Sequence, residues 1–507
     1  MKKILISAFA ASMLLFTYSC DTDFDTDVTG IAVTSGDADF SKYIALGNSL
    51  TAGYRDNALY IDGQVESYPN MIATQMKLAG GGEFKQPLMM DNLGGIPSIG
   101  VGNKLILAMT QSGLSPVPAS GTGTTTLANI YAQGPYQNMG VPGAKSFHLV
   151  ADGYGNVQGV AVGKANPYFV RFASSPTTSV LKDAMAQKPT FFSLWIGNND
   201  VLSYATSGGA GKDQTGNLDP TTYGGNDITD PNVYASVING ILDGLKAAGA
   251  SKGVIANIPN VTSIPFFTTV PHNPVPLDQA SATALNQQVF GPLKQILTAY
   301  GQGSRLQLVG LTNNPLLLKD ETLTNMSAQI TGALVAAGVP AQQAGLMGMV
   351  FGQARHATSA DLIPLTTRTV IGTKPASPMA VAPFDKYGVT FPLEDNHVLT
   401  NTEKEEVLTA TAAYNAAISK LASARGLAMV DANAKMVELS RTSGIQFDGV
   451  KYTTTFVTGG SFSLDGVHLT GRGYAVIANE FIKAINAKYR SNLPQVNVNS
   501  YSGITFP

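Results

Sequence analysis

The sequence predicts a three-layer α/β/α fold in which helices cover both faces of a mostly parallel sheet. Two observations support this prediction: short apolar runs that each stop at a glycine, proline or aspartate, and amphipathic helical segments between these runs. A chain of 507 residues, 44% hydrophobic and 13% charged, can also bury a large core. This composition excludes a disordered or coiled-coil protein.

Four apolar runs are predicted to be buried parallel strands. Strands of this kind are covered on both faces, so they are continuously apolar rather than alternating. The runs are residues 43–46 before Gly47, 190–196 before Gly197, 254–258 before Pro259, and 427–430 before Asp431. Functional groups in parallel α/β sheets gather after the carboxyl ends of the strands, so the residues that follow these runs are candidates for a site.

Two helices are predicted from their ends. Asp230 and Pro231 form an N-cap and first helical position, and Gly249 ends the helix. Its apolar face is formed by Val237, Ile238, Ile241, Leu242 and Leu245. A second helix is predicted from Thr402 to Arg425, with Gly426 as its stop.

Three regions do not fit the strand–helix pattern. Residues 202–229 are rich in Gly, Thr, Asp and Asn, which predicts a long loop. Residues 273–395 are predicted to be a loop-rich insertion that shapes the site, with a helical opening at 276–300 and an extended piece near 362–371. The tail, residues 491–507, is polar and is predicted to be irregular.

The N-terminus predicts secretion. Lys2 and Lys3 precede an apolar run at 4–16, so residues 1–19 are typical of a signal peptide and too short to span a bilayer. Cys20, the only cysteine, resembles the lipidated cysteine of bacterial lipoproteins; an incidental cysteine is the alternative. This resemblance implies a lipid anchor in the outer membrane of a Gram-negative envelope, facing the periplasm or the surface. Residues 20–40 would then form an acidic tether.

Two of the predicted strand ends carry candidate catalytic side chains. Ser49 follows the first run, where a hydroxyl at a helix start lies near oriented N–H groups; a helix-capping serine is the common alternative. Asn199 follows the second run, where its amide can donate to an oxyanion; turn formation is the alternative.

Two further segments carry weaker signals. Asp465 precedes His468 by three residues, so the carboxylate can hold the proton on one ring nitrogen and leave the other as a base. A D-x-x-H pattern also arises by chance. Gly143, at the end of residues 138–143, can donate its backbone N–H to a substrate, although an ordinary turn explains this segment equally well.

Together and in this chain order, the four segments resemble the blocks of the GDSL, or SGNH, hydrolase superfamily. The resemblance covers most of residues 41–272 and 395–490, but not the insertion 273–395. It implies a flavodoxin-like sheet in a hydrolase domain of residues 41–490. The resemblance implies that Ser49 is the nucleophile and that Gly143 and Asn199 are the oxyanion donors. It implies that His468 is the base and that Asp465 orients it. One departure is Asn48, which stands where the family has aspartate.

The expected reaction is hydrolysis of a carboxylic ester through an acyl-enzyme, with no cofactor. Acetylated glycans, short-chain esters and lipids all fit the catalytic group as substrates. A non-catalytic surface lipoprotein that binds glycans or other ligands, and an acyltransferase, are the alternatives. The sequence does not determine the oligomeric state.

Other partners are not expected. The net charge of −2 and the absence of a dense Lys/Arg stripe argue against a nucleic-acid partner. No metal site is expected, because the remaining histidines lack ligand spacing; these are His148, His272, His356 and His397.

Overall fold

A computed structural model describes residues 32–111 and 113–507, and its centre is a five-stranded parallel sheet. The strand order is β4-β1-β5-β6-β9. The strands are β1 (Tyr43–Gly47), β4 (Asn138–Gly140), β5 (Phe191–Trp195), β6 (Lys252–Ala256) and β9 (Ala428–Val430). The registers pair Tyr43 with Phe191 and Val254 with Ala428. The prediction of a mixed α/β fold around a mostly parallel sheet is therefore confirmed. The predicted signal peptide and Cys20 lie outside the described residues.

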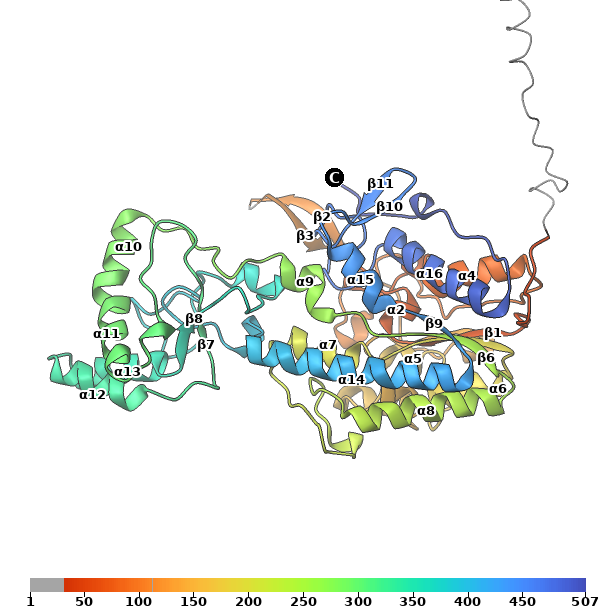
Figure 1. Cartoon of the computed structure of the whole chain (residues 1–507), viewed down its shortest axis with the longest axis horizontal. Helices are drawn as coiled ribbons and strands as arrows, with labels where there is room; N and C mark the ends of the chain where they lie inside the picture. Colours follow the sequence, from red (N-terminus) through yellow and green to blue (C-terminus); the bar gives the residue numbers. More distant parts are fainter. Residues whose placement is uncertain (1–31, 112) are drawn as a thin grey trace, which may run out of the picture.

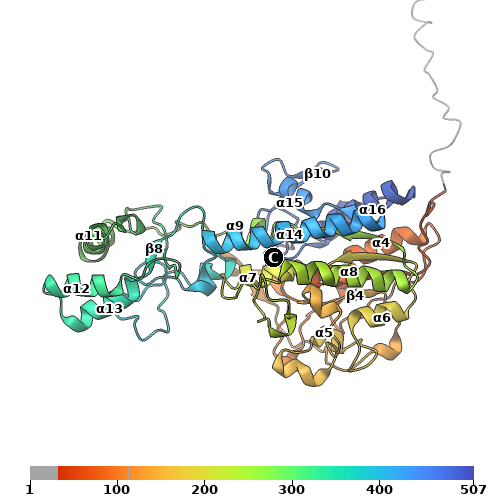
Figure 2. The same ribbon diagram turned by 60° about the horizontal axis from the view of Figure 1, so that its bottom comes forward.

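Helices lie on both faces of this sheet (Figures 1 and 2). One face carries α4 (Tyr68–Lys77), α15 (Ala432–Ser440) and α16 (Gly471–Tyr489). The other carries α6 (Val180–Ala186), α8 (Pro231–Ala247) and α14 (Asn401–Arg425). The predicted helix ends are present: the Asp230 carboxylate accepts hydrogen bonds from Asn232 and Val233 N–H, and Gly426 is left-handed after α14.

Aromatic side chains fill the space between the sheet and its helices. Tyr68 of α4 stacks on Phe481 of α16, with ring centroids 4.8 Å apart. On the opposite face Tyr234 stacks on Tyr414 at 4.3 Å. Fully burying a side chain such as Phe481 contributes about 1.5–3 kcal/mol, so these stacks fix neighbouring helices against each other. Tyr68 also contacts Trp195 of β5 edge to face, at 5.6 Å, which joins α4 to the sheet.

Some elements differ from the sequence prediction. The loop predicted at 202–229 begins later, because the first residues belong to α7 (Asn199–Thr206). The fifth strand, β4, was not predicted, since it has only three residues and no apolar run. Within the segment predicted as extended near 362–371, a 3-10 helix spans Leu365–Thr369. In the described part of the chain, three two-stranded antiparallel sheets also escaped prediction: β2 (Leu105–Thr110) with β3 (Gly113–Pro118), β7 (Leu317–Lys319) with β8 (Ala354–His356), and β10 (Ile445–Phe447) with β11 (Val450–Tyr452).

The insertion lies to one side of the sheet and is more helical than predicted (Figure 1). Its predicted helical opening contains α10 (Gln279–Leu285) and α11 (Gly291–Ala299). Two more helices follow, α12 (Ser327–Ala336) and α13 (Ala341–Phe351). The sequence did not reveal them because their apolar residues are not confined to one face. The insertion has a hydrophobic cluster of its own, which includes Phe290, Leu293, Ile330 and Phe351.

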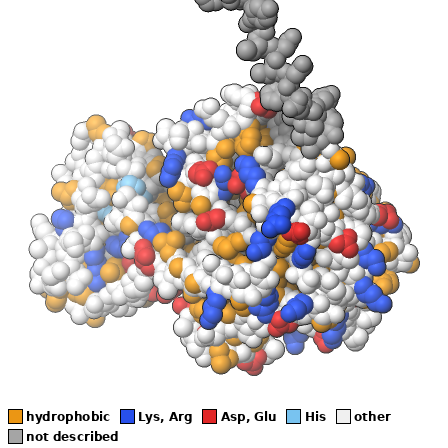
Figure 3. Space-filling view, turned by 45° about the vertical axis from the view of Figure 1, so that its right-hand side comes forward, with side chains coloured by type: hydrophobic (Ala, Val, Ile, Leu, Met, Phe, Trp, Pro, Cys, Tyr) orange, Lys and Arg blue, Asp and Glu red, His pale blue; other side chains and the backbone are white. Residues whose placement is uncertain are grey.

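The surface mixes charged and uncharged side chains. Figure 3 shows acidic and basic residues interspersed on the face in view. Over residues 32–111 and 113–507, no helix is both long enough and apolar enough to cross a bilayer.

Candidate active site

Ser49 lies where β1 turns into a short helix, α2 (Ser49–Ala52). Gly47 permits this tight turn, because a Cβ there would lie 2.1 Å from Thr51 Oγ1 and 2.4 Å from the Trp195 carbonyl oxygen. The helix cap is Asn48, whose Oδ1 accepts a hydrogen bond of 3.1 Å from Leu50 N–H. Ser49 is therefore not the capping residue, and its hydroxyl is available for another role.

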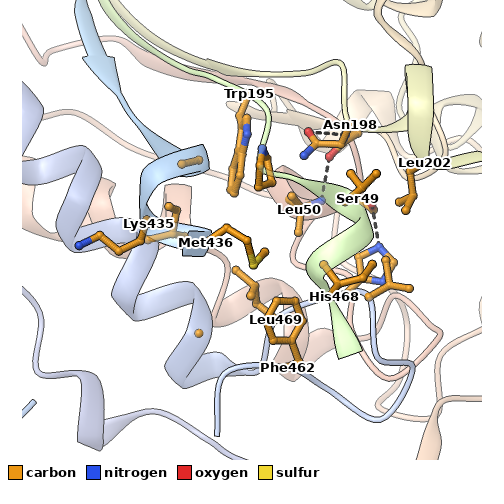
Figure 4. A pocket seen from close by; sticks show the side chains of 18 of the residues that line it. Ser49, Leu50, Trp195, Asn198, Leu202, Lys435, Met436, Phe462, His468 and Leu469 are labelled. Carbon is orange, nitrogen blue, oxygen red and sulfur yellow. Dashed lines mark hydrogen bonds between the residues drawn. The ribbon is translucent and has the colours of Figure 1, made fainter. Parts of the chain in front are cut away.

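The structure brings Ser49, His468 and Asp465 into one hydrogen-bonded chain. His468 Nε2 lies 2.9 Å from Ser49 Oγ, although the two residues are 419 positions apart (Figure 4). His468 Nδ1 lies 2.9 Å from Asp465 Oδ2. A carboxylate can only accept, so Nδ1 carries the proton and Nε2 presents its lone pair to the serine hydroxyl.

The Asp465 carboxylate is held in its ionised form. Burial alone would raise its pKa, but His468 and surrounding N–H donors hold that pKa well below the usual range. Oδ1 accepts hydrogen bonds of 2.8 Å from the backbone N–H groups of Val467 and His468. The acid therefore keeps its charge, which orients the imidazole and stabilises its protonated form.

Residues that the sequence did not single out hold this acid in place. Ser463 Oγ donates to Asp465 Oδ1 at 3.1 Å, and it accepts from Asp56 N–H at 2.9 Å. Asn57 N–H donates to Asp465 Oδ2 at 2.9 Å. No motif marks the contacts of Asp56 and Asn57, because they join segments that are distant in the chain.

Asn199, in the first turn of α7, lines the same pocket as Ser49 and His468. Gly197 makes this turn possible: its φ is 116°, and a Cβ would lie 2.6 Å from the Tyr234 hydroxyl. Asn199 Nδ2 donates one hydrogen bond of 2.9 Å to the Ala144 carbonyl. An amide has two N–H groups, so one remains for a ligand.

Gly143 lies in the turn after β4, next to the Ser49 turn. Val141 N–H donates to the Gly47 carbonyl at 3.0 Å, which ties the two turns together. Gly143 is exposed and left-handed, with φ 80°. Gly143 is not one of the described residues that line the pocket. The structure thus places it at the same sheet edge as Ser49, outside the pocket itself.

A buried carboxylate fixes the loop that carries Gly143. Asp200 accepts hydrogen bonds of 2.8 and 2.6 Å from the N–H and hydroxyl of Ser146. Burial raises the pKa of Asp200, and these two donors oppose that rise.

His148, in the same loop, accepts a hydrogen bond from Lys145 N–H at 3.0 Å. Burial and the nearby Lys145 ammonium lower the pKa of His148 to about 4, so it is neutral near pH 7.

The pocket beside Ser49 is a cavity of about 70 Å³, and its lining is overwhelmingly apolar. It extends from Ser49 and His468 toward α15 and α16 (Figure 4). No residue of the wall comes from 273–395 within the described chain. The insertion was predicted to shape the site, but it does not reach the pocket wall. It approaches the catalytic loop through Leu365: a Cβ added to Gly466 would lie 3.1 Å from Leu365 Cδ2.

The described residues contain no group of three or more His, Cys, Asp or Glu that could hold a metal ion. No model of a known protein family matches the sequence, and no curated protein is significantly similar to it.

Proposed function

We propose that the protein is a serine ester hydrolase of the GDSL/SGNH type. The supporting observation is the chain of two 2.9 Å contacts that joins Ser49 Oγ to His468 and His468 to Asp465. Such a chain lets a base remove the serine proton while a buried carboxylate stabilises the resulting imidazolium.

In this mechanism His468 Nε2 takes the proton from Ser49 Oγ as that oxygen attacks the ester carbonyl. The oxyanion forms beside the Ser49 N–H, the free N–H of the Asn199 amide and the Gly143 N–H. His468 then gives its proton to the leaving alcohol, and an acyl-enzyme remains on Ser49. Water, deprotonated by His468, releases the acid and restores the serine. None of these steps requires a cofactor.

Asn48, at the position of the family aspartate, is compatible with this assignment. Its Oδ1 caps α2, as a carboxylate there would, and its Nδ2 donates to Asn198 Oδ1 at 3.3 Å. An amide thus links the nucleophile turn to the oxyanion turn. The chain order of the four segments and the parallel sheet support an SGNH-type, flavodoxin-like architecture for the finer fold.

We also propose that Cys20 carries a lipid that anchors the enzyme in a Gram-negative outer membrane. The support is the sequence: a basic start, an apolar run at 4–16, and a single cysteine directly after residues 1–19.

The test of the activity is Ser49→Ala, assayed on p-nitrophenyl esters. Loss of a triad nucleophile should lower kcat by several orders of magnitude while the melting temperature stays unchanged. Ser179→Ala is a matched control, because Ser179 is a true helix cap that accepts from Lys182 N–H. That variant should lose about 1 kcal/mol of stability and keep its activity. Turnover retained by Ser49→Ala would refute the proposal.

A further inference from the structure

We infer that the apolar pocket beside Ser49 binds the acyl chain of the substrate, so that the enzyme cleaves esters of medium-chain fatty acids in preference to acetyl esters. This inference rests on the proposed function and narrows it. An acetyl group has a single methyl to bury, whereas the pocket extends well beyond the nucleophile.

Beyond the catalytic residues and their neighbouring asparagines, the pocket wall is made mostly of side chains that form no hydrogen bonds. α15 contributes Ala432, Met436 and Leu439, which recur on one face of the helix, and Phe462 and Leu469 cover the side nearer His468. Figure 4 shows Met436, Phe462 and Leu469 pointing into the space beside Leu50 and Ser49. A glycan would leave its hydroxyls without partners against this wall, and that costs free energy. The lining therefore favours a hydrocarbon chain.

Lys435, the one Lys or Arg among the described residues of the wall, does not contradict this. The Lys435 ammonium lies 2.7 Å from Glu438 Oε2 and 3.3 Å from Glu480 Oε1. Figure 4 shows it pointing away from the pocket. Lys435 therefore presents its methylene stem to the cavity and keeps its charge paired outside it.

The acyl half of the ester fits the pocket better than the alcohol half. The acyl group stays bonded to Ser49 through both steps of the reaction, so a buried site can hold it throughout. The alcohol must leave before water attacks the acyl-enzyme, and deep burial would slow that departure. The apolar contacts thus stabilise the group that remains.

The first experiment compares p-nitrophenyl acetate, butanoate, octanoate and dodecanoate. Each buried methylene can raise kcat/KM by up to roughly fourfold, so octanoate should exceed acetate by at least about tenfold. A parallel series of alkyl acetates, from ethyl to octyl, should show little gain. A preference for acetate, or a gain confined to the alcohol series, would overturn the inference.

The second experiment fills the pocket. Ala432 is buried in its wall, and Ala432→Phe should lower the octanoate-to-acetate ratio of kcat/KM at least about tenfold. Ala434 lies on the same helix but is exposed, so Ala434→Phe should keep the wild-type ratio. An unchanged ratio in a folded Ala432→Phe would contradict the assignment of the pocket.

A binding measurement covers the case in which Ala432→Phe does not fold. Trp195 is the only tryptophan of the chain and lines the pocket, so its fluorescence reports occupancy. In Ser49→Ala, ω-bromo-octanoate should quench this emission saturably, while sodium bromide should not. Equal, non-saturating quenching by both would refute the acyl site. The proposed function fails separately, if Ser49→Ala retains turnover on every ester.

Discussion

The backbone N–H of Asn57 donates a 2.9 Å hydrogen bond to Asp465 Oδ2 across a sequence separation of 408 residues. Asn57 and its neighbour Asp56 both have left-handed backbones, with φ of 61° and 53°. Non-glycine residues rarely adopt this conformation, and asparagine and aspartate tolerate it best. The turn that follows the nucleophile helix is therefore shaped to hold the acid of the catalytic chain.

Substitution of Asn57 should separate backbone conformation from side-chain chemistry. Asn57→Val should cost about 1–2 kcal/mol, because a β-branched residue resists a left-handed backbone. It should also lower kcat severalfold through a displaced Asp465. Asn57→Gly keeps both the N–H and the conformation, so it should stay near wild type. Kinetics and melting temperatures of the two variants test this, and equal damage in both would instead assign the effect to the Asn57 side chain.

Acidification should destabilise the protein through the half-buried His148 and the buried His356. Burial and the nearby Lys145 lower the pKa of His148 to about 4. Burial and the nearby Lys294 lower the pKa of His356 to about 4 as well. In the unfolded chain both imidazoles bind a proton near pH 6.5, whereas in the folded chain they do so only near pH 4. The free energy of unfolding that they contribute is therefore fully present above about pH 6.5. It should fall by on the order of 3 kcal/mol per histidine between about pH 6.5 and 4.

Urea unfolding at several pH values measures this loss. His148→Asn and His356→Asn each replace the imidazole with a side chain that can still accept the hydrogen bond from Lys145 or Gln307 N–H. Each variant should be less stable at pH 7 but lose less stability on acidification. A pH dependence identical to wild type in both variants would show that other groups control it.

The sequence was most informative where a buried strand leads directly into a polar residue. Ser49 and Asn199 could be expected at one edge of the sheet because each follows an apolar strand, and the two strands, β1 and β5, are adjacent in the structure. Asp465 and His468 could be paired because they are close in sequence. Ser463 and Asp56 could not be foreseen, since contacts between distant loops depend on packing that no local pattern encodes.

The lipid anchor predicts a change of location. Cys20→Ser removes the only thiol of the chain and with it the proposed acylation site. The variant should move from the membrane fraction to the soluble fraction of its native host, because no other hydrophobic attachment is proposed. Cell fractionation with activity measured in each fraction is the test. A wild-type protein that is already fully soluble would refute the anchor.

Asn199 provides the sharpest test of the oxyanion site. Its amide donates one N–H to the Ala144 carbonyl, so loss of the side chain removes a loop contact as well as an oxyanion donor. Asn199→Ala should lower kcat by roughly 10²–10³ with little change in KM. The lost loop contact should add only a small fall in melting temperature.

Asn199→Asp distinguishes the two roles of this amide. A carboxylate of nearly the same shape would repel both the Ala144 carbonyl and the developing negative charge. It should therefore be at least as damaging to kcat as alanine. Asp200→Asn is the matched comparison, because Asp200 holds Ser146 in the same loop but does not line the pocket. That change should lower stability more than it lowers kcat. Near-wild-type turnover in Asn199→Asp would remove Asn199 from the mechanism, and the oxyanion would then have to be stabilised by the backbone N–H groups of Ser49 and Gly143.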